Sequence, residues 1–284
     1  MEVKATLKRN QGRFRKTVAY SGMLLGVVVM AVPFLWMVLT SFKTFPETLK
    51  YPITWLPEKI QFENFAVVIN RFSFGRYTLN TIFVTAVLTF GQLAICSLAA
   101  YAFSRLSFPG KEFFFFLILS ILMVPEQMTL IPRFLVVQKL GWLNTFKGII
   151  IPSLPSAYGT FFLVQFMKTL PREIEESGKI DGCSVFRLFW NITLPMCKNG
   201  IIALSIIVVL WAWNSLLWPL IVINSDKVSV LAIGLATLNA MPGYTNRYNI
   251  LMAGAVLVTI PMLAVFIAGQ KKLISGIAIS GMKA

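Results

Sequence analysis

Residues that could carry covalent chemistry are scarce in this sequence. It has no histidine, which excludes Ser-His-Asp and Cys-His nucleophiles, HExxH zinc sites and histidine proton relays. The three cysteines, Cys96, Cys183 and Cys197, have neither a metal-ligand spacing nor a disulfide framework. The pairs Gly110-Lys111 and Gly178-Lys179 lack the upstream glycine and the following Ser/Thr of a phosphate-binding loop. We therefore expect no enzyme, no ATPase site, no metal and no cofactor in this chain.

The composition predicts a protein that lies in lipid. Of 284 residues, 57% are hydrophobic and 13% are charged, whereas a soluble domain carries about a quarter charged residues. The net charge of +15 suits binding to a phosphate backbone, but the basic residues lie between long apolar runs. We interpret them as cytosolic anchors of membrane loops and expect no nucleic-acid partner.

Six apolar runs are long enough to cross hydrocarbon, which takes about 20 residues in a helix. Five are uncharged and lie between Lys16 and Lys43, Arg76 and Arg105, Lys147 and Lys168, Lys198 and Asp226, and Arg247 and Lys271. The sixth, from Phe113 to about Val137, contains Glu126 and Arg133. Runs of this length satisfy their backbone in lipid as helices. The predicted fold class is an all-α polytopic membrane protein with six transmembrane helices.

The orientation follows from the basic residues near the ends of the spans. Residues 1–16 carry six Lys/Arg against one acid, Glu2, and cytosolic loops carry such an excess. We predict a cytosolic basic tail at 1–16 and a transmembrane domain at 17–284, with both termini and the segment 168–198 in the cytosol. The longest external loops are then about 42–77 and about 224–247. The basic residues of the first of these loops weaken the charge difference between the two sides of the membrane.

The cytosolic segment has the signals of a short helical hairpin. Thr169 can cap a first helix, whose early acids, among them Glu173, suit the positive end of its dipole. Gly182 can end this helix in a left-handed conformation, and Ser184 can cap a second helix at about 185–192 that ends near Pro195. Ser177 and Gly178 have almost no side chain, so a partner surface could approach the backbone there.

The same segment resembles the coupling-loop signature of bacterial ATP-binding-cassette importer permeases. In that signature Glu-Ala-Ala precedes Asp-Gly-Ala and, after a short helix, Leu-Pro; here the pattern is Glu176-Ser-Gly-x-x-Asp181-Gly182, followed by Leu194-Pro195. Ser177, Gly178 and Cys183 replace the alanines, and a proline often found after Leu-Pro is missing near Asn199-Gly200. The residues that the resemblance places against a partner ATPase are Glu173, Glu176, Ser177, Gly178, Asp181, Gly182 and Pro195.

Other segments are similar to carbohydrate-uptake permeases, in particular to the maltose-type subunit with six helices. They are Trp211 to Leu220, the turn Leu106 to Gly110 and the tail Gly276 to Lys283. The resemblance implies a type I importer permease fold in the cytoplasmic membrane, working by alternating access on a sugar, oligosaccharide or polyol derivative. Its implied partners are a homologous second permease, two ATPase subunits that hydrolyse the ATP, and an extracellular solute-binding protein.

Three polar or aromatic residues within the spans are candidates for the translocation path. Glu126 is an ionisable group at membrane depth, which favours a function; alternatively it lies near the interface and pairs with Arg133. Asn214 and Trp218 could hold a sugar, because aromatic faces stack on pyranose rings. Such polar residues also serve as hydrogen-bonding contacts between helices.

The segment 241–248 is polar and rich in turn formers. In the maltose-type subunit the corresponding loop reaches into the binding protein, which implies contacts from Gly243, Tyr244, Asn246 and Arg247. An ordinary connecting loop is the alternative.

A different class, an ion-coupled secondary transporter or channel, would need intramembrane carboxylates or discontinuous helices for its coupling ions. Glu126 alone qualifies, and the cytosolic hairpin would have no role.

Overall fold

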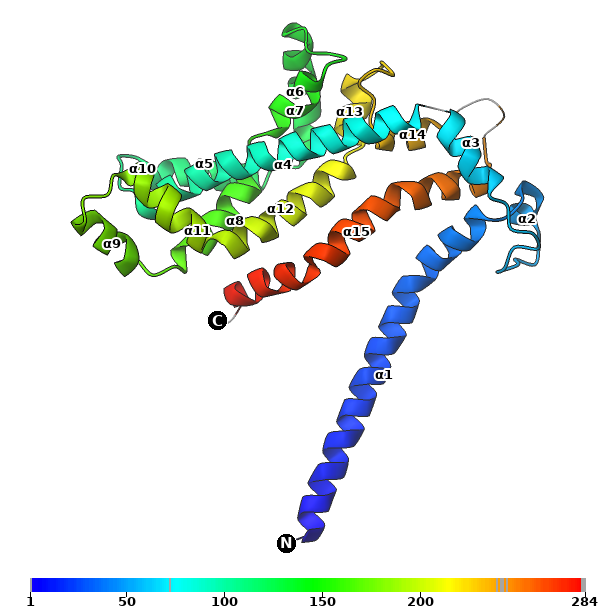
Figure 1. Ribbon diagram of the computed structural model, residues 1–284, viewed down its shortest axis with the longest axis horizontal. Coiled ribbons are helices and arrows are strands. Elements are labelled where there is room, and N and C mark those ends of the chain that lie inside the picture. Colours follow the sequence, from blue (N-terminus) through cyan, green and yellow to red (C-terminus); the bar gives the residue numbers. More distant parts are fainter. Residues whose placement is uncertain (1, 72, 239, 241–242, 244, 282–284) are drawn as a thin grey trace. The chain divides into compact units, whose positions relative to one another are not determined.

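The computed structural model describes residues 2–71, 73–238, 240, 243 and 245–281, and within them the side chains of 16, 18–71, 73–238, 240, 243 and 245–270. In this part of the chain every regular element is a helix (Figure 1). The predicted all-α fold class is confirmed.

The helices fall into two compact units. The first contains the chain up to Arg71 and residues 238–257. Its helices are α1 (Glu2–Ser41), α2 (Phe45–Leu49), α3 (Glu63–Arg71) and the first turns of α15 (Tyr248–Gly281). Helix α1 runs without interruption from the basic tail into the first predicted span.

Hydrogen bonds from two asparagines join the elements of the first unit. Asn64 in α3 donates through Nδ2 to the carbonyls of Ser41 and Lys43, at 2.8 and 2.9 Å. Asn249 in α15 donates to Asn64 Oδ1 at 2.8 Å. The Lys43 side chain is buried, with its ammonium 4.3 Å from the centre of the Trp36 ring, and burial lowers its pKa.

Glu47 organises the loop that follows α1. Its carboxylate accepts the Thr44 N–H at 2.6 Å and the Glu58 N–H at 2.7 Å. Burial opposes ionisation, but these bonds and the Thr44 hydroxyl together hold the pKa of Glu47 below its ordinary value. Pro46, Pro52 and Pro57 lie between α1 and α3, where the structure forms only the short helix α2.

The second unit contains 72–237 and the rest of α15 from Val258. Its elements are α4 (Phe74–Arg105), α5 (Lys111–Ile121), α6 (Glu126–Lys139), α7 (Phe146–Ile150), the 3-10 turn η1 (Ile151–Ser153), α8 (Ala157–Lys168), α9 (Glu173–Ile180), α10 (Val185–Leu188), the π-helical turn η2 (Phe189–Thr193), α11 (Leu194–Met196), α12 (Lys198–Trp213), α13 (Leu217–Val222) and α14 (Leu231–Leu238). The long helix α4 packs against α8 and α12. Two apolar clusters, one around Leu88 and one around Leu163, lie along α4.

Helix α4 separates the two segments that the predicted topology places on opposite sides of the membrane. Near its start, the Tyr77 hydroxyl donates to Asp226 at 2.7 Å. At its end, Arg105 lies 2.9 Å from Glu175 in α9. The 28 residue steps from Tyr77 to Arg105 span about 42 Å at the helical rise, which exceeds the about 30 Å of a hydrocarbon core. The loop around Asp226 and the segment 173–193 therefore lie at opposite ends of α4 (Figure 1).

Among the described residues, three helices are long and apolar enough to cross a membrane, and six spans result if each of three bent helix pairs is one crossing. The straight ones are Val18–Ser41, Phe74–Arg105 and Tyr248–Gln270. The bent pairs are Lys111–Ile121 with Glu126–Lys139, Phe146–Ser153 with Ala157–Lys168, and Val185–Met196 with Lys198–Trp213.

Three predicted spans differ from the structure. The fourth, between Lys147 and Lys168, is divided into α7 with η1 and α8, which meet at 40°. The third is no single rod, because α5 and α6 meet at 100° around Pro125, where proline removes a backbone donor. The fifth does not reach Asp226: α12 ends at Trp213, and Asn214 caps it by donating to the Leu210 carbonyl at 2.8 Å.

Candidate functional site: a helical hairpin and a cavity

The segment 173–193 folds as the predicted hairpin. Gly182 adopts the left-handed conformation, with φ 77°, and the Cys183 N–H closes the turn on the Gly178 carbonyl at 2.9 Å. Ser184 caps α10 by accepting the Arg187 N–H at 3.4 Å. The predicted cap at Thr169 is wrong, because Thr169 ends α8 and Arg172 stands before α9.

Most of the residues predicted to meet an ATPase lie on the surface of the hairpin or, in the case of Pro195, just after it. They are Glu173, Glu176, Ser177, Asp181, Gly182 and Pro195, all of them exposed. Pro195 does not end the second helix but lies within the first turn of α11.

Gly178 does not offer its backbone to a partner, which corrects the sequence-based expectation. It is buried, and a Cβ atom at this position would lie 2.7 Å from Leu188 Cδ2 and 3.0 Å from Ile192 Cδ1. The glycine lets α9 pack closely on the second arm of its own hairpin.

A buried ion pair fixes the hairpin to the end of α4. Arg105 Nε lies 2.9 Å from Glu175 Oε1, and the two side chains are 4% and 7% exposed. Arg105 Nη2 also donates to the carbonyls of Met167 and Leu170, at 2.7 and 3.0 Å, where α8 ends. The Thr193 hydroxyl donates to Glu175 at 3.0 Å. We name Arg105, Glu175 and Thr193 the hairpin anchor.

This anchor was not predicted from the sequence as a functional feature. Glu175 looked like one of several acids in the first turn of a solvated helix. Arg105 served only to mark the end of a span. The sequence shows Arg105 as a charge at the end of the second span and Glu175 as an acid beside Glu176. No pattern in the sequence indicates that these two side chains are in contact.

The second candidate site is a cavity of about 340 Å³ in the second unit, within the range of small-molecule sites, about 300–1,000 Å³. Helices α4, α6, α8 and α12 and the residues around η1 form its walls. The lining residues are Gln92, Leu122, Glu126, Arg133, Pro152, Ser153, Pro155, Ser156, Ala157, Tyr158, Ile207, Val208 and Trp211. The candidate Glu126 thus lines a cavity, and it also pairs with Arg133 at 3.5 Å.

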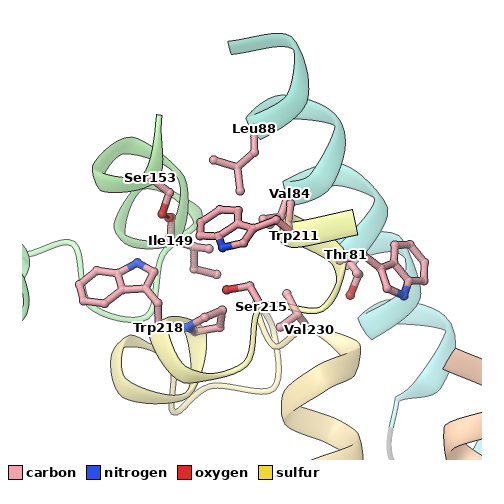
Figure 2. Close-up of a pocket in the computed structure, with 12 residues that line it drawn as sticks. Thr81, Val84, Leu88, Ile149, Ser153, Trp211, Ser215, Trp218 and Val230 are labelled. Carbon is pink, nitrogen blue, oxygen red and sulfur yellow. Dashed lines mark hydrogen bonds between the residues drawn. The ribbon is translucent and has the colours of Figure 1, made fainter. Parts of the chain in front are cut away.

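Trp218 lies behind this cavity and does not line it. The Arg133 guanidinium covers its ring at 3.9 Å, and its Nε1 donates to the Gly148 carbonyl at 3.1 Å. Trp218 borders instead a separate void of about 10 Å³, room for about one water. Figure 2 shows this void, with Ser153 and Trp211, which also line the larger cavity, on its wall.

Asn214 is exposed and bonded to its own helix, and it lines neither the cavity nor the void. The structure thus brings Glu126 to the cavity and leaves the other two candidates outside it.

The predicted external contact segment belongs to the first unit. Gly243 and Asn246 both have positive φ, 80° and 63°, as expected of a turn, and the Arg247 guanidinium lies 5.5 Å from the centre of the Phe45 ring. Tyr244 lies outside the described residues, as do positions 282–284 of the tail.

Residues 92–278 match the model of one protein family, described as the inner membrane component of binding-protein-dependent transport systems. This chain belongs to that family. The match begins at Gln92 in α4 and includes both the hairpin and the cavity.

Curated relatives align over nearly the whole of this inner membrane component. The arabinooligosaccharides transport system permease protein AraQ of Halalkalibacterium halodurans is 33% identical over 90% of this chain and 92% of its own length. The sn-glycerol-3-phosphate transport system permease protein UgpE of Brucella abortus is 30% identical over 90% and 93%.

A solved structure has the same fold. It is that of a bacterial ABC transporter involved in the import of the acidic polysaccharide alginate, with a TM-score of 0.79 and 21% identity over 90% of this chain and 96% of that chain. The prediction of a membrane-spanning transport permease is confirmed, and the ion-coupled alternative has no support.

Proposed function

We propose that this chain is one of two homologous permease subunits of an ATP-driven sugar importer. Two ATPase subunits bind at its cytosolic face and an extracellular solute-binding protein delivers the cargo. Both termini and the hairpin lie in the cytosol, and the loop around Asp226 lies outside.

The hairpin is the observation that carries this proposal. It presents a short acidic helix, α9, whose exposed residues include Glu176 and Asp181, at one end of a membrane-crossing helix. Such a projection gives a second protein a surface to hold. The buried side of the same helix is fixed to α4 and α8 by the hairpin anchor.

The hairpin anchor explains how a movement outside the membrane reaches the helices within it. Because Arg105 is the last residue of α4 and bonds to both α8 and α9, a displacement of α9 pulls on two transmembrane elements together. Packed helices move as rigid bodies in such transitions. Closure of the ATPase pair would in this way turn the cavity from one side of the membrane to the other.

The relatives suggest the cargo. AraQ is named for arabinooligosaccharides and UgpE for sn-glycerol-3-phosphate, so the cargo class we propose is a sugar, oligosaccharide or polyol derivative. The cavity beside Glu126 lies on the path of this cargo, and the segment 243–247 contacts the solute-binding protein.

Two substitutions in the turn of the hairpin test the proposal. Asp181→Arg reverses an exposed charge, and Gly182→Pro forbids the positive φ of the turn. We expect both variants to insert into the membrane but to lose copurification with the ATPase subunits and ATP-dependent uptake into vesicles. Glu112→Arg, which reverses another exposed charge beyond the same end of α4, is the control and should keep both.

Full uptake and full ATPase binding by the Asp181 and Gly182 variants would overturn the proposal. So would loss of both properties in the Glu112 variant, because the effect would then not depend on the hairpin.

A further inference from the structure

The cavity between α4, α6, α8 and α12 contains one negative and one positive side chain, and they face each other. Glu126 Oε1 lies 3.5 Å from Arg133 Nη1. The other described residues that line the cavity are uncharged. The two charges therefore cancel, and the cavity as a whole is neutral.

The Arg133 guanidinium is already held by the protein on several sides. Nη2 donates to Ser153 Oγ, Nη1 faces Glu126, and the flat side covers the Trp218 ring at 3.9 Å. Nε is buried without a hydrogen-bond partner, so a ligand in the cavity cannot reach it. Bidentate recognition of a phosphate or carboxylate needs two parallel N–H groups along one edge. Neither edge of Arg133 is open for it.

Glu126 is the charged group that a ligand meets first. Its side chain is 53% exposed, against 17% for Arg133. A carboxylate accepts hydrogen bonds from hydroxyl groups and repels an anion, the more so where little water screens the two charges. The site therefore attracts hydroxylated neutral molecules and disfavours acidic ones.

Two aromatic side chains complete the walls. Trp211 and Tyr158 line the cavity and are 42% and 46% exposed. A sugar ring has an apolar C–H face and a polar hydroxyl edge, which match an aromatic wall beside a carboxylate. Apolar walls with a few placed polar groups are typical of small-molecule sites.

We infer that this cavity binds an uncharged sugar or oligosaccharide, and that the Glu126–Arg133 pair excludes anionic cargo such as sugar phosphates and sugar acids. The inference rests on the proposed function, because it takes the cavity as part of the cargo path. It goes further in assigning the charge class of the cargo to one ion pair of this chain.

Binding to the purified, detergent-solubilised transporter without ATP tests the inference. The probes are arabinotriose, xylotriose and maltotriose, each beside its own aldonic acid, which has similar size and one added carboxylate. Equilibrium dialysis measures the dissociation constants. We expect the wild-type complex to prefer the neutral member of at least one pair by about tenfold or more.

Variants of the ion pair give the decisive comparison. Glu126→Gln keeps the shape of the side chain but leaves the charge of Arg133 without its counter-ion. For the trisaccharide whose neutral form the wild type prefers, this variant should instead bind the aldonic acid more tightly. The double variant Glu126→Gln with Arg133→Gln restores neutrality and should restore the preference for the neutral sugar. Lys139→Gln, at the other end of α6 and outside the cavity, should behave as the wild type.

Absence of a neutral preference in all three pairs, or an unchanged preference in Glu126→Gln, would overturn the inference. The binding measurement needs neither ATP nor the hairpin, so its result stands apart from the uptake test of the Asp181 and Gly182 variants. A neutral preference together with full uptake by those variants would refute the coupling role and keep the inference about the cavity.

Discussion

Gly178 determines how closely the two arms of the hairpin pack. The atoms that a Cβ would meet, Leu188 Cδ2 and Ile192 Cδ1, are the ends of flexible side chains. Gly178→Ala should therefore be tolerated, because a small shift makes room and alanine gains up to about 1 kcal/mol of helix propensity. Gly178→Val should destabilise the hairpin by about 1–3 kcal/mol through overpacking. Hydrogen exchange of the amides of 173–193 measures both effects.

Binding of the ATPase subunits should follow the same order, with Gly178→Ala close to the wild type. If Gly178→Ala instead abolished binding while the exchange of 173–193 stayed unchanged, position 178 would touch the partner directly.

For single residues, the sequence predicts local turn and cap geometry but not burial that depends on distant residues. The φ of Gly182 and the cap at Ser184 were predictable, because turn and cap chemistry depends on neighbours a few residues away. The contrast between buried Glu175 and exposed Glu176 was not. It depends on Arg105, 70 residues earlier, and no local pattern shows that the two meet.

At the scale of elements, the hairpin anchor joins three helices. The buried charge pair of Arg105 and Glu175 connects α4 to α9, and the hydrogen bonds of Arg105 connect α4 to the end of α8. Glu175→Gln keeps the shape of the side chain and leaves the buried guanidinium without its counter-ion. Breaking a buried pair in this way costs about 3–5 kcal/mol. We expect ATP hydrolysis by the assembled transporter to continue and uptake per ATP to fall roughly 5- to 150-fold, the range of a typical coupling free energy.

The paired substitution Arg105→Gln with Glu175→Gln provides the control. It removes both charges, so its loss of thermal stability should be smaller than the sum of the two single losses, by the interaction energy of the pair. Additive losses of stability, or a normal ratio of uptake to hydrolysis in Glu175→Gln, would show that the anchor does not transmit motion.

Some helix breaks and ends have local causes that the sequence shows, and others depend on packing against distant residues. The break in the third span was foreseeable in kind, since Pro125 and Glu126 interrupt an apolar run. Its 100° angle was not, because the packing of α6 sets it, including the contact of Arg133 with Trp218. The early end of α12 left no trace in hydropathy, since the residues beyond Asn214 are as apolar as those before it.

At the scale of the whole molecule, hydropathy predicted the membrane location, and the six predicted crossings agree with the structure if each bent helix pair of the described residues is one crossing. Apolar length is dictated by the thickness of the bilayer, which is the same for every span. The cavity could not be predicted from hydropathy and charge. Its lining comes mainly from four separate helices, and only Glu126 and Arg133 stood out in the sequence, as charges within an apolar run.

The topology gives a last prediction, on which the direction of coupling depends. Lys179 in the hairpin and Lys227 in the loop beside Asp226 are both exposed and belong to segments at opposite ends of α4. In a background without Cys96, Cys183 and Cys197, we expect Lys227→Cys to react with a membrane-impermeant maleimide added to intact cells. Lys179→Cys should react only after the membrane is opened, because the proposed topology has the basic residues 1–16 in the cytosol and, four crossings later, the hairpin on the same side. Labelling of both positions from outside would contradict the separation of the two segments by α4. Labelling of Lys179→Cys alone would show that the orientation is inverted, with the hairpin outside the cell, where no cytosolic ATPase could bind it.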